Sequence, residues 1–250
     1  MAQRNGAAGR RGSGGRGNAP RGGRHAAGRD GAKKAGAPKR AASKPAPLPS
    51  TPEARVFRLG VIPGAMPGRW ADRWQERMTH ATLELVPIEV AAQRRALDDR
   101  LVDAAIVRRP LDETGLHVVA LYDEVPVVVV ASESDLTVVE ELQPADLEGS
   151  VVITPLDDVL GALDLAGTTA ARFDPPETTA DAIATVATGV GVAIVPLSLA
   201  RLHHRRDVTY RPLVDGPVSS VAFAWPQDGD SDDVQAFVGI IRGRTANSSR

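Results

Sequence analysis

The chain has 250 residues, of which 42% are hydrophobic and 24% charged, with no cysteine and a formal net charge of -1. The absence of cysteine excludes disulfides, thiolate metal sites and catalytic thiols. No uncharged apolar run reaches the length of about 18 residues that indicates a membrane span. The basic N-terminus has no apolar segment before Val56, so it does not resemble a secretory signal, and we expect a cytoplasmic protein.

The balanced net charge conceals two unlike parts. Residues 1–50 carry eight Arg and four Lys against one acid, whereas residues 51–250 hold 18 basic and 30 acidic residues. Residues 1–53 have too few large apolar side chains to offset chain entropy, which predicts a disordered tail, and residues 245–250 are expected to be a flexible C-terminus. Such a tail suits weak, sequence-independent contact with nucleic-acid phosphates. It equally suits a solubilising tail or an upstream extension that is not translated. The candidate phosphate contacts are Arg10, Arg11, Arg16, Arg21, Arg24, Lys33, Lys34, Lys39 and Arg40.

The next hundred residues alternate between apolar runs and helix-like stretches. "RVFRLGVI" (55–62), "TLELVPIE" (82–89) and "VDAAIV" (102–107) predict strands. Between them, residues 68–80 place Trp70, Trp74 and Met78 on one helical face, and residues 91–101 predict a helix with Leu97 and Leu101 inward. The result is a β-α-β-α-β unit, but it lacks a GxGxxG turn, which disfavours dinucleotide binding.

A second alternating series follows. "EVPVVVVA" (124–131) is apolar enough for a strand buried on both faces. Strands are then predicted at 151–154, 168–173, 190–196 and 218–225, with helices at 155–163, 178–189 and 231–243. The helix over 178–189 begins with a threonine cap and ends at Gly189. The whole series predicts an α/β fold with largely parallel sheets.

Several of these segments resemble the effector-binding domain of LysR-type transcriptional regulators. The resemblance rests on "FRLGVI", "ALDDRLVDAAIVRRP" and "ETTADAIATVATGVGVAIVPLSLA", and it covers about residues 56–244. It implies the periplasmic-binding-protein type II fold, with two Rossmann-like subdomains joined by a two-strand hinge. Residues 54–127 plus 217–244 would form the first subdomain and 128–216 the second, with "VPVVVVA" and "VSSVAFAW" as the crossing strands.

The resemblance also implies a small-molecule effector, a role in transcription regulation and a homodimer formed through this domain. The family carries a winged helix-turn-helix before the domain, and nothing in residues 1–50 can form a recognition helix. We therefore expect an effector-binding module without its own DNA reader. The effector is expected to be a small organic or aromatic acid.

Ligands of such folds bind at the carboxyl ends of strands, where helix N-termini present backbone N–H groups. The bare loop after the first strand can approach a ligand closely, although a plain Gly/Pro turn would look the same. One of two adjacent arginines could clamp a carboxylate, the alternative being surface ion pairs with Asp112 or Glu113. Three threonines could bind a ligand or only cap helices. The expected ligand-binding residues are Pro63, Gly64, Ala65, Met66, Arg108, Arg109, Thr154, Thr178 and Thr179.

No enzyme motif accompanies these residues. The sequence has no GxSxG, HExxH or P-loop, and we expect neither a catalytic site nor a cofactor. "HHRRD" (203–207) lacks the spacing that places two histidines on one helical face, so no metal site is expected. The alternative to a sensor is a protein that associates with nucleic acid through its tail and uses the folded part to dimerise. An enzyme on the same fold would need clustered acids or histidines that the sequence does not reveal.

Overall fold

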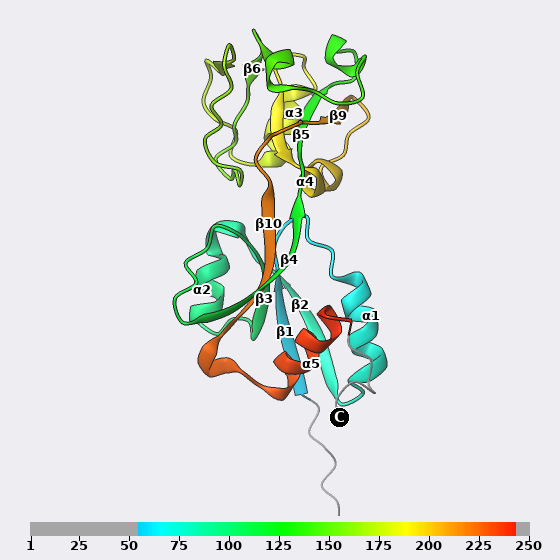
Figure 1. The fold of residues 1–250 in the computed structure, drawn as a ribbon, viewed down its shortest axis with the longest axis vertical. Coiled ribbons are helices and arrows are strands. Elements are labelled where there is room, and N and C mark those ends of the chain that lie inside the picture. The colour runs from blue at the N-terminus through cyan, green and yellow to red at the C-terminus, as the bar shows by residue number, and fades with distance from the viewer. Residues whose placement is uncertain (1–54, 244–250) are drawn as a thin grey trace, which may run out of the picture. The chain divides into compact units, whose positions relative to one another are not determined.

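The computed structural model describes residues 55–243. Ten strands and five α-helices alternate along this range (Figure 1). The strands are β1 (Arg55–Val61), β2 (Ala81–Pro87), β3 (Ala104–Arg108), β4 (Leu116–Glu124), β5 (Pro126–Ala131), β6 (Val151–Val152), β7 (Thr169–Ala170), β8 (Ala193–Pro196), β9 (Val208–Pro212) and β10 (Ser219–Pro226). The α-helices are α1 (Gly68–Arg77), α2 (Gln93–Asp98), α3 (Thr179–Val186), α4 (Leu197–Leu202) and α5 (Asp232–Ile241), and the 3-10 helices are η1 (Val90–Ala92), η2 (Asp135–Thr137), η3 (Pro144–Leu147) and η4 (Gln227–Gly229).

The first lobe is built on a five-stranded sheet in the order β2-β1-β3-β10-β4. β1 pairs in parallel with β2 and β3, whereas β10 runs antiparallel to β3 and β4. Alternate residues of β3 point to opposite faces, as the period of a strand requires. Ala104 and Ile106 pack in a core with Trp74 of α1 and Phe237 of α5, while the intervening residues pack beside Leu97 of α2. Helices therefore cover both faces of this sheet.

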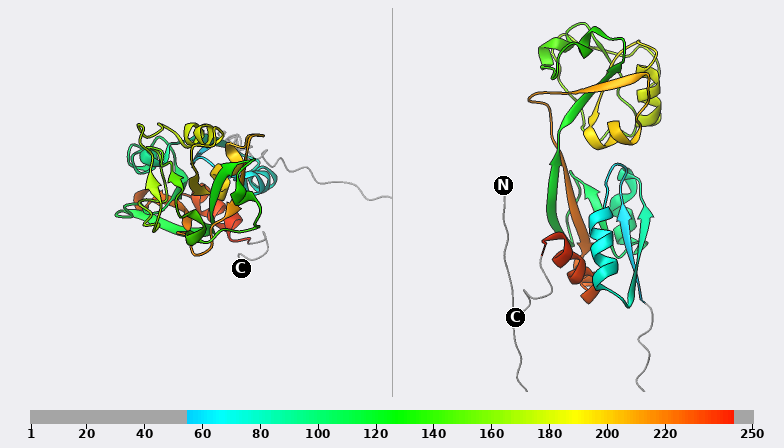
Figure 2. Two further views of the ribbon diagram at one scale, coloured as in Figure 1. Left: turned by 90° about the horizontal axis from the view of Figure 1, so that it is seen from above. Right: turned by 90° about the vertical axis from the view of Figure 1, so that its right-hand side faces the viewer.

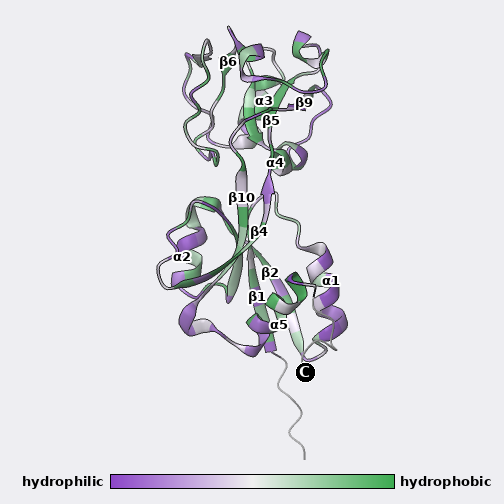
Figure 3. Ribbon diagram, viewed as in Figure 1, coloured by the Kyte–Doolittle hydropathy of each residue, from purple (hydrophilic) through white to green (hydrophobic). Residues whose placement is uncertain are grey.

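The second lobe is built on a three-stranded sheet in the order β8-β5-β9, with the short β6–β7 pair beside it. β5 runs antiparallel to both of its neighbours. Val127 and Val129 pack beside Ile183 of α3 and Leu199 of α4, and the alternate valines of β5 pack beside Leu147 on the other face. Figure 3 shows the hydrophobic colouring along β5 that follows from this burial on both faces.

The chain passes between the two lobes twice, at residues 124–126 and at residues 213–218. β4 and β10 lie side by side as they approach this hinge, and Ser219 pairs with Glu124 in their register (Figure 1, Figure 2). The expected fold of two Rossmann-like subdomains joined by a two-strand hinge is confirmed. The hinge differs in detail from the expectation, because β5 and β10 each lie wholly within one sheet and only short segments cross.

The structure departs from the sequence expectations in five further respects. No helix forms over residues 155–163, where Asp158 instead accepts hydrogen bonds from the N–H groups of Leu160 and Gly161. The expected strand over 168–173 is limited to Thr169–Ala170, and β4 was not predicted at all. Leu101 is 58% exposed because α2 ends at Asp98, before it could turn that side chain inward. The sheets are mixed rather than largely parallel.

The aromatic face predicted for residues 68–80 is confirmed in α1. Trp74 is fully buried, and Trp70 and Met78 pack against the same core. The Trp74 indole N–H donates to the carbonyl of Ala81 at 2.8 Å, so its one polar group is satisfied inside the core. Ile183 and Val186 of α3 are likewise fully buried. Among residues 55–243 no helix is long and apolar enough to cross a bilayer.

Candidate functional site

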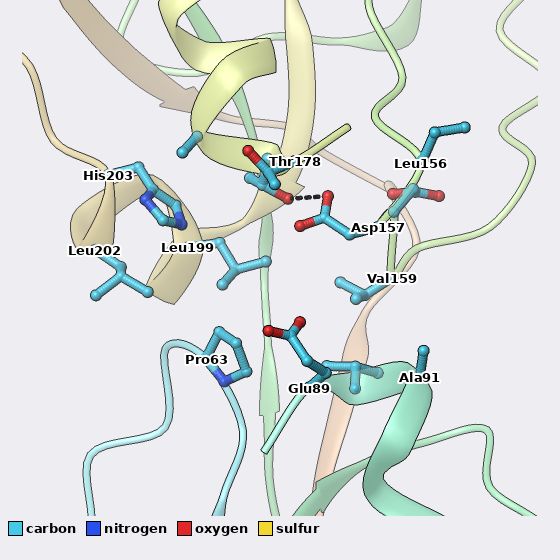
Figure 4. Close-up of a pocket in the computed structure, with 14 residues that line it drawn as sticks. Pro63, Glu89, Ala91, Leu156, Asp157, Val159, Thr178, Leu199, Leu202 and His203 are labelled. Atoms are coloured by element: carbon cyan, nitrogen blue, oxygen red, sulfur yellow. Dashed lines mark hydrogen bonds between the residues drawn. The ribbon is translucent and has the colours of Figure 1, made fainter. Parts of the chain in front are cut away.

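A cavity of about 450 Å³ lies where segments of the two lobes meet (Figure 4). Both lobes belong to one compact unit of the chain. The first lobe contributes the loop after β1 and the segment after β2, and the second contributes the loop after β6, the start of α3 and the end of α4. The residues that line the cavity are Pro63, Glu89, Val90, Ala91, Leu156, Asp157, Asp158, Val159, Thr178, Thr179, Ala180, Leu199, Leu202 and His203.

The first lobe places its share of the cavity at the carboxyl ends of two parallel strands. Val61 of β1 lies opposite Pro87 of β2, so the residues that follow each strand emerge at the same edge of the sheet. Pro63 follows β1 and Glu89 follows β2, and both line the cavity. Figure 4 shows the Glu89 side chain pointing from this edge into the cavity.

The second lobe contributes the N-terminus of α3. Thr178 is the N-cap, and its hydroxyl accepts from the N–H of Asp181 at 3.1 Å and donates to the Asp181 carboxylate at 2.7 Å. The hydroxyl of Thr179 donates to Asp157 at 2.9 Å, which holds the loop after β6 against the helix start. Thr178 thus caps the helix, which is one of the two expected roles, and both threonines also line the cavity.

The charges lining the cavity are mostly negative. Glu89, Asp157 and Asp158 supply three carboxylates, and His203 supplies an imidazole. No lysine or arginine of the described range lines it. The walls between these groups are apolar, formed in part by Val159, which gives an acidic cavity with hydrophobic sides.

Gly64, Ala65, Met66 and Thr154, also expected in the site, do not line this cavity. Pro63 is shared with a second cavity of about 500 Å³, which Gly64 and Ala65 also line. Met66 is 86% exposed and lines neither of these two cavities. Thr154 lines a third cavity beside β6 and β7.

Arg108 and Arg109, expected to clamp a ligand, do not line this cavity. The Arg108 side chain is 1% exposed and its Nη1 lies 2.9 Å from a carboxylate oxygen of Glu124, whose side chain is 8% exposed. Arg109 points the other way and pairs with Glu113 at 2.7 Å on the surface, as the alternative interpretation had it. Alternation along the strand predicts that at most one of the two arginines points inward. That residue is Arg108, and inside the protein its charge is paired with Glu124.

Arg108 and Glu124 form the centre of a buried polar network at the hinge. Ser219, at the start of β10, accepts from Arg108, and Ser198 of α4 donates to Glu124 at 2.8 Å. Arg108 Nε and Nη2 have no hydrogen-bond partner. The backbone N–H and carbonyl of Arg108 are both bound by the side chain of Gln93. The network thus joins α4 of the second lobe to β3, β4 and β10 of the first.

Gly64 meets this network from the first lobe. Its φ of +82° lies in the left-handed region that favours glycine, and a Cβ here would lie 2.9 Å from the Cβ of Ser198 and overlap its hydroxyl. The glycine in the bare loop is therefore explained by a backbone turn and by close contact with α4. Ligand contact is not needed to account for it.

Sequence reasoning missed Glu89, Asp157 and Asp158 as cavity residues. A usable signal existed for Glu89, because the carboxyl end of the second parallel strand must share an edge with the first. Asp157 and Asp158 were hidden by the incorrect helix over 155–163. The described residues contain no cluster of three or more potential metal ligands. The nine candidate phosphate contacts of the tail lie outside the described residues.

Comparison with solved structures places the described chain in the type II periplasmic-binding-protein fold class. The BenM effector-binding domain with its effector benzoate superposes with a TM-score of 0.63 at 18% identity, covering 76% of this chain and 92% of that one. The oxidised form of OxyR gives 0.62 at 18% identity, with 80% and 100% covered. The reduced OxyR regulatory domain from Pseudomonas aeruginosa gives 0.57 at 20% identity, with 76% and 98% covered.

The family is shown by sequence. The model of the LysR substrate binding domain matches residues 50–246, so the chain belongs to this family. No curated protein sequence matches the chain. The resemblance inferred from the motifs is therefore confirmed.

Proposed function

We propose that the chain is a small-molecule sensor whose effector binds in the cavity between the lobes. The strongest support is that residues from both lobes, on either side of the two-strand hinge, line the cavity. A ligand that contacts both lobes stabilises the closed arrangement by its differential affinity for that arrangement. The proposed moving units are residues 54–127 with 217–244, and residues 128–216. The function is binding without turnover, in the cytoplasm.

Family membership supports a role in transcription regulation and self-association as a homodimer. The benzoate in the similar BenM structure is an effector of that protein. An organic or aromatic acid was our expectation for this chain as well. The charge lining the cavity argues against that class, because the two arginines expected to read a carboxylate are engaged elsewhere and the groups that remain are acidic.

The sensor proposal is tested by thermal unfolding of the full chain with a panel of small amines, acids and neutral compounds. A ligand present at about 100 times its dissociation constant stabilises the folded state by about 2.7 kcal/mol. Ala91→Trp would fill the cavity and abolish the shift, whereas Ala92→Trp is a matched control on the neighbouring exposed residue, which does not line it. No shift with any compound, or equal loss in both variants, would refute the proposal.

A further inference from the structure

The charged groups of the inter-lobe cavity define what class of ligand it can hold. Glu89 reaches in from the first lobe and Asp157 from the second, and Figure 4 shows the two carboxylates on opposite sides of the cavity. The side chain of Glu89 makes no hydrogen bond or ion pair with any residue in the range 55–243. Asp157 accepts a single side-chain hydrogen bond, from Thr179. Both carboxylates therefore have lone pairs free for a ligand.

Two groups of the described range that could attract an anion already have an acidic residue beside them. The N-terminus of α3 carries a partial positive charge, but Asp181 lies in its first turn and Thr178 caps it. The buried guanidinium of Arg108 is paired with Glu124 at the hinge. An anion entering the cavity would therefore meet three carboxylates and a histidine with no arginine or lysine to receive it.

We propose that this cavity binds a small organic cation, a protonated amine attached to an apolar body, with the ammonium group between Glu89 and Asp157. The proposal rests on the sensor function and specifies its ligand. An ammonium group donates up to three hydrogen bonds and accepts none, which matches two ionised carboxylates, because these only accept. The apolar body packs against Pro63, Val159 and Leu199. A metal ion is disfavoured because the described residues offer no cluster of three ligands.

The same arrangement explains how binding is linked to closure. Glu89 and Asp157 belong to different lobes, so closing the cleft would bring two like charges closer together. A cation between them replaces this repulsion with two attractions. The ligand thus favours the closed arrangement specifically, which is the requirement for shifting a conformational equilibrium.

The test compares ligands that differ in charge but little in shape. The full chain is titrated by calorimetry, and its thermal unfolding is followed, with three pairs: benzylamine and benzoate, phenethylamine and phenylacetate, butylamine and butyrate. We expect at least one amine to bind and raise the unfolding temperature while its paired acid does not. Binding of acids without amines would overturn the cation proposal and leave the sensor intact. Absence of binding by all three amines would also overturn it, and the wider panel with Ala91→Trp decides the sensor proposal separately.

Charge variants then locate the contact. Glu89→Gln and Asp157→Asn should each raise the dissociation constant of the bound amine about tenfold, as expected for loss of a charge-assisted hydrogen bond. Glu177→Gln is the matched control, because it removes one exposed acid near α3 that does not line the cavity. An equal effect of Glu89→Gln and Glu177→Gln would show that only net charge matters and would overturn the assignment. Glu89 is exposed and has no partner, so its replacement should leave the fold intact.

Discussion

The ion pair between Arg108 and Glu124 should behave as a buried unit whose two halves cannot be removed separately. Their side chains are 1% and 8% exposed, and the two charges lie 2.9 Å apart. In Glu124→Leu the Arg108 guanidinium would keep Ser219 as its only hydrogen-bond partner. Its Nε and Nη2 have no partner even in the unchanged protein. In Arg108→Met the carboxylate would keep only the hydroxyl of Ser198. Each replacement therefore leaves an uncompensated buried charge.

We expect each single variant to lose about 3–5 kcal/mol of unfolding free energy, a large part of the 5–15 kcal/mol typical of a folded domain. The double variant, with methionine and leucine in place of the pair, should lose less than either single variant, because no charge is left buried. Urea unfolding followed by circular dichroism measures all three. Losses below about 1 kcal/mol in the single variants, or additive losses in the double variant, would show that the two charges are not a coupled buried pair. Should a single variant fail to fold, recovery of folding in the double variant gives the same answer.

Three further predictions concern the loop after β1, the cap of α3 and Tyr122 of β4. Gly64→Ala should lower the unfolding free energy by about 1–3 kcal/mol. This loss should exceed that of Gly115→Ala, because Gly115 has a similar positive φ of +71° but open space around it. Equal losses in thermal melts would contradict the contact between Gly64 and α4. Thr178→Ala should lower the unfolding free energy by about 1 kcal/mol through loss of the N-cap, and Thr178→Ser should restore it in the same urea titration. Burial, and then the charge of Glu124, raise the pKa of Tyr122 above its usual 10.0. The stability contribution of Tyr122 is therefore full below pH 10.0 and is lost as the pH rises through the raised pKa. Tyr122→Phe should flatten this alkaline decline in thermal melts, and an unchanged profile would show that Tyr122 does not cause it.

The elements predicted correctly are those whose pattern is local. β3 and β5 are uniformly apolar because both of their faces are covered, and α3 has a cap, an apolar face and a terminal glycine within one short stretch. β4 was not predicted because it lies at the edge of its sheet, where it pairs only with β10, and its buried and exposed residues do not alternate regularly. Residues 155–163 have helix-like spacing, but Pro155 and the positive φ of Gly161 favour turns.

The candidate site was less predictable because it depends on contacts between distant segments. Arg108 and Glu124 are 16 residues apart and meet only because β3 and β4 both pair with β10. No local pattern reveals that this pairing removes the arginine from the cleft. The acidic lining likewise arises where Glu89 and Asp157, from different lobes, come to the same cavity.

The distribution of aromatic residues gives the two lobes different optical properties. All three tryptophans, Trp70, Trp74 and Trp225, pack in the core of the first lobe, and residues 126–212 contain none. Tryptophan emission therefore monitors the unfolding of one lobe, whereas far-ultraviolet circular dichroism monitors both. Coincident denaturation curves from the two signals would show that the lobes unfold as one cooperative unit, and separate midpoints would show that the hinge divides them.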